Sequence, residues 1–227
     1  CDGPIQNNPE ELDKVLKTRM VIDKEIDWNY KSLKKLLSDN NRGCKEGVVS
    51  AINWFFENEE EGIIIEDDCL PHPDFFEFAK IMLDKYRNDK RIWCISGNNF
   101  QNNQIRGDGS YYFSIYPHVW GWATWKRCWK EYDIDMKTWP HFKKEKLLDS
   151  IFSRKMEANY WEKLFNKMYY YGEPDTWDYQ WLYVCLKNNA LSVIPNTNLV
   201  ENIGYGNDAT HTTSDTISPA KLKNHEL

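Results

Sequence analysis

The sequence lacks the surplus of basic residues with which nucleic-acid-binding proteins neutralise phosphates. Its 29 Lys and Arg residues are outnumbered by 35 Asp and Glu residues, which leaves a formal net charge of −6 at pH 7. No basic stripe is present, so nucleic acid is not expected as the main ligand. A local cationic pocket for a nucleotide diphosphate is still compatible with this composition.

The sequence also has no run of about 18 apolar residues, the length of a membrane-spanning helix, and no signal-peptide pattern at its start. We therefore expect no transmembrane segment in this chain. Its six cysteines form no CxxC pair, and several lie among apolar residues, where Cys behaves as a small hydrophobe. Free thiols are favoured, which predicts a cytoplasmic protein, with peripheral membrane association as a variant. The even number of cysteines keeps disulfides and a secretory or Golgi-lumen location as the alternative.

Aromatic residues, by contrast, are abundant, with 11 Trp and 13 Tyr in 227 residues. Some of these rings are expected in the core, because aromatic side chains bury large areas. The excess is consistent with sugar binding, since a sugar ring presents a C–H face that packs on an indole. For any single ring both interpretations remain open.

Helical and strand patterns alternate along the chain with short connections. Apolar residues at helical spacing predict helices, and short apolar runs bounded by turn residues predict strands. The predicted helices are 9–22, 44–56 and 74–86, with a mainly helical stretch after Trp125 through Leu186; the predicted strands are 63–65, 91–96, 111–113 and 191–194, with 31–37 a strand or short helix and strand favoured. Residues from 196 onward are polar and loop-like.

This order of elements predicts an α/β fold, with a mostly parallel central sheet flanked by helices and a helical C-terminal part. The length suits a single domain over residues 1–227. Ile63, Ile64 and Ile65 show no polar alternation, which predicts a central strand buried on both faces.

Three acids, Glu66, Asp67 and Asp68, follow this apolar strand directly. Ligands of open α/β sheets bind outside the carboxyl ends of the strands. Adjacent carboxylates repel one another, so a compensating cation or hydrogen bonds are needed there. Mg²⁺ and Mn²⁺ favour carboxylate and phosphate oxygens, which predicts a metal between acid and phosphate. The alternative is an acidic turn before the next helix, although Asp74 is the better candidate for capping that helix.

Several motifs accompany this acid run: DGP at the start, NxGC at residues 41–44, EDDC at 66–69, WGWATW at 120–125 and TWDYQW at 176–181. Together they resemble a set of bacterial and viral glycosyltransferases with the GT-A fold, across nearly the whole of the chain from Asp2 to His211. More distantly, EDD is similar to the motif of the N-acetylglucosaminyltransferase I family. The resemblance implies a Rossmann-like GT-A fold, with residues 1–100 binding the nucleotide-sugar and 101–227 forming the acceptor-binding and catalytic half. The opening strand of that family is not found before Cys1.

The resemblance also implies the donor side of the site. Asp68 would bind Mn²⁺ or Mg²⁺ directly, with His211 as a second ligand; otherwise His211 is an exposed loop histidine. Glu66 and Asp67 would contact the donor or support the metal. Asp2 would face the nucleobase and Arg42 the diphosphate, against the alternatives of an ordinary turn Asp and a surface Arg. 

On the acceptor side, the resemblance implies that Asp178 is the general base, with an N-terminal helix cap as the alternative role. An inverting transfer needs one carboxylate to accept the proton of the acceptor hydroxyl. The resemblance places the Trp-rich segment near donor sugar and acceptor, and the residues expected to contact them are Trp120, Gly121, Trp122 and Trp177.

The predicted function is thus a metal-dependent glycosyltransferase, moving a hexosyl or N-acetylhexosaminyl group from a nucleotide-diphosphate sugar to a glycan or other hydroxyl acceptor. A UDP-sugar is favoured by resemblance, and the reaction is expected to invert. Two alternatives stay open: a carbohydrate-binding domain of the same fold without turnover, and a metal-dependent phosphoesterase or nucleotidyltransferase, which also uses acids at strand ends.

Overall fold

The computed structural model describes residues 1–102 and 104–204. The helices are α1 (Pro9–Glu25), α2 (Gly43–Asn58), α3 (Pro73–Tyr86), α4 (Lys126–Trp129), α5 (Trp139–Lys144), α6 (Leu147–Ile151), α7 (Lys155–Tyr171) and α8 (Asp178–Lys187). The strands are β1 (Glu61–Ile64), β2 (Cys69–Pro71), β3 (Ile92–Ser96), β4 (Tyr111–Ser114), β5 (Trp122–Trp125), β6 (Leu191–Pro195) and β7 (Val200–Asn202). The prediction of a mixed α/β protein is confirmed.

The central sheet has the strand order β1-β5-β3-β6-β4. β3 and β6 are parallel, whereas β1–β5, β3–β5 and β4–β6 are antiparallel pairs. The prediction of a mostly parallel sheet is therefore wrong for the described strands. One reason is β5, which lies in the Trp-rich segment, was not predicted as a strand, and inserts between β1 and β3 in the opposite direction to both. The other is β4, which pairs with β6 in the opposite direction. β1, β3 and β6 still share one direction.

β1 lies at an edge of this sheet, among the described strands. Ile63 and Ile64 are only half-buried and Ile65 is 38% exposed, so the prediction of a central strand buried on both faces is also wrong. A run of β-branched residues indicates an apolar environment, but it does not indicate how many strands lie beside the strand that they form. The fully buried strand of this sheet is β3, where every residue is buried.

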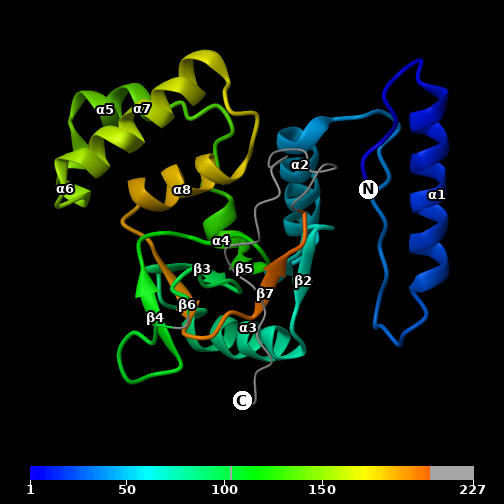
Figure 1. The fold of residues 1–227 in the computed structure, drawn as a ribbon, viewed down its shortest axis with the longest axis horizontal. Helices are drawn as coiled ribbons and strands as arrows, with labels where there is room; N and C mark the ends of the chain where they lie inside the picture. The colour runs from blue at the N-terminus through cyan, green and yellow to red at the C-terminus, as the bar shows by residue number, and fades with distance from the viewer. Residues whose placement is uncertain (103, 205–227) are drawn as a thin grey trace.

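Helices cover both faces of the sheet (Figure 1). α3 packs under β1, β3 and β5 through Phe75, Ala79, Met82 and Leu83, while α4 and α8 lie on the opposite side. The cap of α3 is His72, whose Nδ1 accepts the Asp74 amide at 3.3 Å. Asp74 was the predicted cap; it instead lies inside the first turn, where a carboxylate is stabilised by the helix dipole.

Much of the aromatic excess is in the core. Trp122 and Trp181 are fully buried with ring centroids 5.4 Å apart, and Trp129 packs 5.5 Å from Trp181. Such ring pairs stabilise a core by roughly 0.5–1.5 kcal/mol beyond the area they bury. The cluster joins β5, α4 and α8, and it fixes the start of α8 over the sheet.

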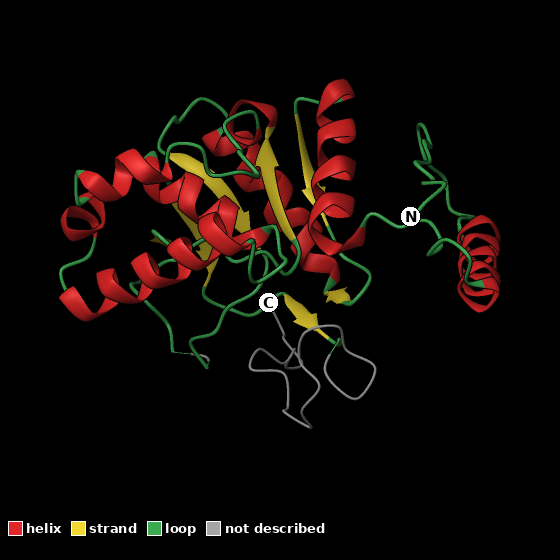
Figure 2. Cartoon of the chain, turned by 90° about the horizontal axis from the view of Figure 1, so that it is seen from above, coloured by secondary structure: helices red, strands yellow, loops and turns green. Residues whose placement is uncertain are grey.

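The first 42 residues form an arm beside this body (Figure 2). α1 begins at Pro9, as predicted; Asn8 caps it, and the helix has no buried residue. Segment 31–37, for which a strand was favoured over a short helix, forms neither. It nevertheless meets the start of the chain, since the Cys1 amino group donates to Leu36 O at 2.9 Å and Ser38 N donates to Cys1 O at 3.1 Å.

A second, two-stranded sheet pairs β2 with β7, in a region predicted as loop. Val200 of β7 reaches the main sheet, where a Cβ added to Gly97 would lie 2.5 Å from its Cγ2 and 2.6 Å from Gly121 O. Gly97 N donates to Gly121 O at 2.7 Å, so glycine at position 97 permits a close backbone approach. In the described part of the chain, no helix is both long and apolar enough for a membrane span.

Candidate active site

The acid run leaves the end of β1 and enters β2 through a tight turn. Cys69 N donates to Glu66 O at 3.1 Å, and Ile203 N, just after β7, donates to Asp68 O at 2.8 Å. Asp67 is exposed, whereas Glu66 and Asp68 are half-buried. The turn therefore presents Asp67 to solvent and holds the other two carboxylates against the protein.

The carboxyl group of Glu66 lies in a strongly anionic, partly dry environment. Its pKa is raised from 4.5 to about 7, chiefly because burial removes water, and then because Asp68, Asp178 and Asp67 repel its charge. A hydrogen bond from the side chain of Trp177 opposes this rise. Trp177 thereby links the TWDYQW motif to the EDD motif.

Asp178 is the first residue of α8, next to the N-cap residue Trp177. The hydroxyl of Thr176 donates a hydrogen bond to Oδ1 of Asp178, and Oδ2 is the other carboxylate oxygen. Neither Asp175 nor Thr176 caps α8, because no side-chain cap is found and Trp177 occupies that position. Asp178 also lines a cavity of about 170 Å³ together with Tyr116, Trp161 and Tyr179.

The thiol of Cys44, at the start of α2, shows that these acids converge. Its pKa is raised from 9.0 to about 11 by burial first, and then by Glu66, Asp175, Asp178 and Asp68 in that order. Carboxylates from the β1–β2 turn and from the start of α8 thus meet at the N-terminus of α2. The helix dipole there is favourable to negative charge.

Positive charge is scarce in this cluster. Lys45 Nζ lies 3.5 Å from Asp175 Oδ1. Within residues 1–102 and 104–204, no ion pair involves Glu66, Asp68 or Asp178. Cys44, Lys45 and Asp175 were not predicted as site residues; their signal in the sequence was their position in or beside the NxGC and TWDYQW motifs.

Asp2 and Arg42, which were predicted to contact the donor, both lie at the start of α2. The Asp2 carboxylate accepts the amides of Gly3 at 2.8 Å, Arg42 at 3.0 Å and Gly43 at 3.2 Å. Asp2, although remote in sequence, thus caps the first turn of α2. Arg42 is exposed, and its Nε donates to Ser38 Oγ at 3.2 Å.

The predicted acceptor contacts divide by burial. Trp122 is 0% exposed and Trp177 is 2% exposed, with their rings stacked at 5.6 Å, so neither presents a free face in this structure. Gly121 is buried as well, with φ +60°, against Val200. Trp120 is half-buried and packs edge-on to Phe100 at 5.0 Å.

The remaining predicted metal ligand, His211, lies outside the described residues. Within the described residues, no three His, Cys, Asp or Glu side chains form a group that would hold a metal ion by themselves. The six cysteines are all unpaired thiols.

The chain was also compared with known proteins. It matches no protein-family model, and no curated protein is significantly similar to it.

Proposed function

We propose that this protein is a metal-dependent glycosyltransferase that moves a sugar from a nucleotide-diphosphate donor, with a UDP-sugar favoured, to a hydroxyl acceptor. The observation that carries the proposal is the convergence of Asp178 with Glu66 and Asp68. Asp178 comes from the opposite half of the chain to Glu66 and Asp68, and the charges of Asp68 and Asp178 both add to the raised pKa of Glu66. The resemblance of both motifs to GT-A glycosyltransferases adds the sugar-transfer chemistry.

The acids fit a hard divalent cation, Mn²⁺ or Mg²⁺. Glu66 and Asp68 are half-buried carboxylates that repel each other and pair with no Lys or Arg of the described residues. Such ions are often held by one or two carboxylates together with substrate phosphates and water. Asp68 would hold the ion, with Glu66 beside it, and a bound ion would offset the charge that develops on the leaving diphosphate.

The other site residues act on the acceptor. Asp178 Oδ2 would accept the proton of the acceptor hydroxyl. The oxygen of that hydroxyl would attack the anomeric carbon from the face opposite the diphosphate, which leaves, so the configuration is inverted. Thr176 and the start of α8 fix the direction of this carboxylate. Trp177 holds Glu66 through its hydrogen bond and so keeps the donor side aligned with the base.

Thermal unfolding with UDP and Mn²⁺ tests the donor half of this proposal. At a hundred times its dissociation constant, UDP stabilises the protein by about 2.7 kcal/mol, which raises Tm by roughly 5–10 °C for a chain of this length. Asp68→Asn should abolish the rise, and Asp13→Asn on the exposed face of α1 should retain it. Absence of a rise with any nucleoside diphosphate and either metal would refute the glycosyltransferase assignment.

The catalytic half is tested with Asp178→Asn. This variant should keep the UDP-dependent rise in Tm and lose sugar transfer by roughly two to four orders of magnitude, as expected for loss of a general base. Full transfer by Asp178→Asn would exclude this residue as the base. Carbohydrate binding without any transfer by the wild type would favour the alternative of a binding domain without turnover.

A further inference from the structure

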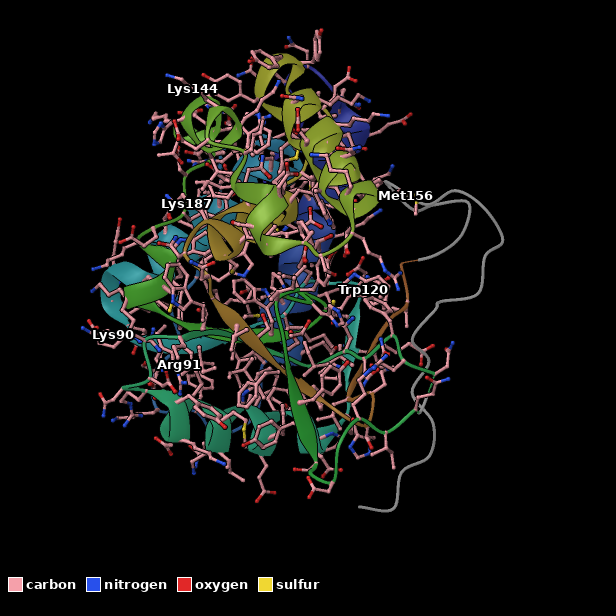
Figure 3. All side chains as sticks on the ribbon, turned by 90° about the vertical axis from the view of Figure 1, so that its left-hand side faces the viewer. Lys90, Arg91, Trp120, Lys144, Met156 and Lys187 are labelled. Carbon is pink, nitrogen blue, oxygen red and sulfur yellow. The ribbon has the colours of Figure 1, made fainter. Side chains whose placement is uncertain are left out.

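The cavity beside Asp178 is lined mainly by aromatic and aliphatic side chains that carry no charge. It is lined by Tyr116, Pro117, His118, Val119, Trp161, Asp178, Tyr179 and Leu182. These residues come from the loop before β5, from α7 and from α8; Figure 3 shows this side of the molecule, with Met156 near the start of α7 and Trp120 on the loop. At about 170 Å³, it is smaller than the roughly 300–1,000 Å³ pockets of drug-sized ligands, so it has room for about one ring.

The polar ends of the aromatic walls are used within the protein. Trp161 Nε1 donates to Tyr116 Oη at 3.1 Å, and the Tyr116 hydroxyl in turn donates to Glu157. Burial and the hydrogen bond to Glu157 raise the pKa of Tyr116 to about 12, so this hydroxyl keeps its proton. What these two rings offer to a ligand is therefore apolar surface.

Trp161 is held rigidly as a platform. Phe165, which is fully buried, stacks on the indole at 5.7 Å with an interplanar angle of 27°, and Tyr179 meets it edge-on at 6.2 Å. The indole is half-buried and lines the cavity. A pre-organised ring loses little entropy when a ligand packs on it.

Among the residues that line the cavity, Asp178 is the one with a carboxylate side chain. Burial lowers the pKa of His118, which disfavours its charged form, and its Nδ1 lies within hydrogen-bonding distance of Asn98 O, at 3.1 Å. Glu66, Asp68 and Asp175 lie in the same acid cluster as Asp178. An anionic ligand would meet repulsion here, whereas a neutral ligand with a hydroxyl can donate to Asp178.

We propose that this cavity is the acceptor subsite and that it takes an uncharged sugar ring, with the C–H face of the ring on Trp161 and one hydroxyl donating to Asp178. The assignment rests on the proposed function for its role in transfer, but the binding itself does not require a donor. It makes Trp161 the residue that selects the acceptor, in place of the buried Trp122 and Trp177. It also predicts that acceptors bearing a carboxylate on this ring are rejected.

Saturation-transfer NMR on the full chain, without nucleotide, tests the binding directly. The probes are methyl β-D-glucopyranoside, methyl β-D-galactopyranoside and the anionic methyl β-D-glucuronide. At least one neutral glycoside should bind, and the glucuronide should bind at least ten-fold more weakly. Equal binding of the glucuronide, or no binding of either neutral glycoside, would overturn the proposal.

Variants on α7 locate the site. Trp161→Leu should weaken binding of the neutral glycoside roughly three- to ten-fold, which is the worth of one aromatic contact. Trp161→Phe, which keeps a ring to pack on Phe165, should show a smaller loss. Tyr171→Ala is the matched control, because that ring is on the same helix and 77% exposed, whereas Tyr160 packs edge-on to Trp161 at 5.0 Å. Equal losses in Tyr171→Ala and Trp161→Leu would place the glycoside elsewhere.

The same preparations are assayed for the UDP- and Mn²⁺-dependent rise in Tm, so that the two proposals fail separately. A rise in Tm without glycoside binding removes the acceptor subsite and leaves the glycosyltransferase assignment. Glycoside binding that depends on Trp161, without any nucleotide effect, supports the cavity as a sugar site and removes the glycosyltransferase assignment.

Discussion

Glu66→Gln should stabilise the metal-free protein at alkaline pH and leave it nearly unchanged at acid pH. The folded protein holds the Glu66 proton up to a pKa of about 7, against 4.5 for the ordinary group. The contribution that the bound proton makes to the free energy of unfolding is fully present below pH 4.5 and is lost as pH rises through 7. The difference of the two pKa values corresponds to roughly 3 kcal/mol at 1.36 kcal/mol per unit.

Glutamine keeps the shape of the side chain and an oxygen that can accept the Trp177 hydrogen bond, but it never ionises. In EDTA at pH 8, Glu66→Gln should therefore gain up to roughly 3 kcal/mol over wild type, or about 6–12 °C in Tm. At pH 4.5 the two proteins should agree within about 0.5 kcal/mol. Urea unfolding at both pH values measures the difference, and subtracting wild type removes the titration of other groups.

Asp67→Asn is the matched control, because it removes a neighbouring charge from an exposed side chain. Its gain at pH 8 should be much smaller, since Asp67 is the last of the causes that raise the pKa of Glu66. A gain by Glu66→Gln that is equal at pH 4.5 and pH 8 would refute the reasoning. So would a gain at pH 8 no larger than that of Asp67→Asn.

Two further changes test how the site is supported. Gly97→Ala should lower the free energy of unfolding in urea by roughly 1–3 kcal/mol, because its Cβ would lie 2.6 Å from Gly121 O. Gly109→Ala, where the nearest atom is 3.5 Å away, should lower it by less than half as much. Equal losses in the two variants would contradict the packing argument. Asp2→Ala should cost roughly 0.5–2 kcal/mol through loss of the α2 cap and lower the protection of the Arg42 and Gly43 amides in hydrogen exchange, whereas unchanged protection would rule out capping.

The sequence predicted those elements whose pattern is local. α2, α3, β3 and β6 were found within a few residues, because apolar periodicity or a continuous apolar run marks each one. β5 was missed, since all four residues of WATW are buried and no alternation distinguishes them from a loop of core rings. The antiparallel pairs of β5 with β1 and β3 were therefore missed, and the pattern of residues 111–113 did not show that β4 runs antiparallel to β6.

Prediction of the site had a similar limit. Asp178, Glu66 and Asp68 were singled out by motif, but spacing in the sequence says nothing about whether a carboxylate on α8 meets a turn after β1. Trp122 and Trp177 were expected to face a ligand, yet they are core residues, because burial of a ring depends on its three-dimensional neighbours. Trp161 had no motif and became visible only through the cavity that it lines.

The parallel pairing of β3 with β6 has a consequence for how the protein is made. β6 lies between β3 and β4, and its register joins Ile92 with Leu191. Contacts between residues so distant in sequence form slowly, because a long loop must close first. During synthesis the ribosome releases β6 long after β3, so β4 stays unattached and α8 has no completed sheet to dock on. The acid turn after β1 is thus synthesised early, and we expect Asp178 to reach it only late in folding.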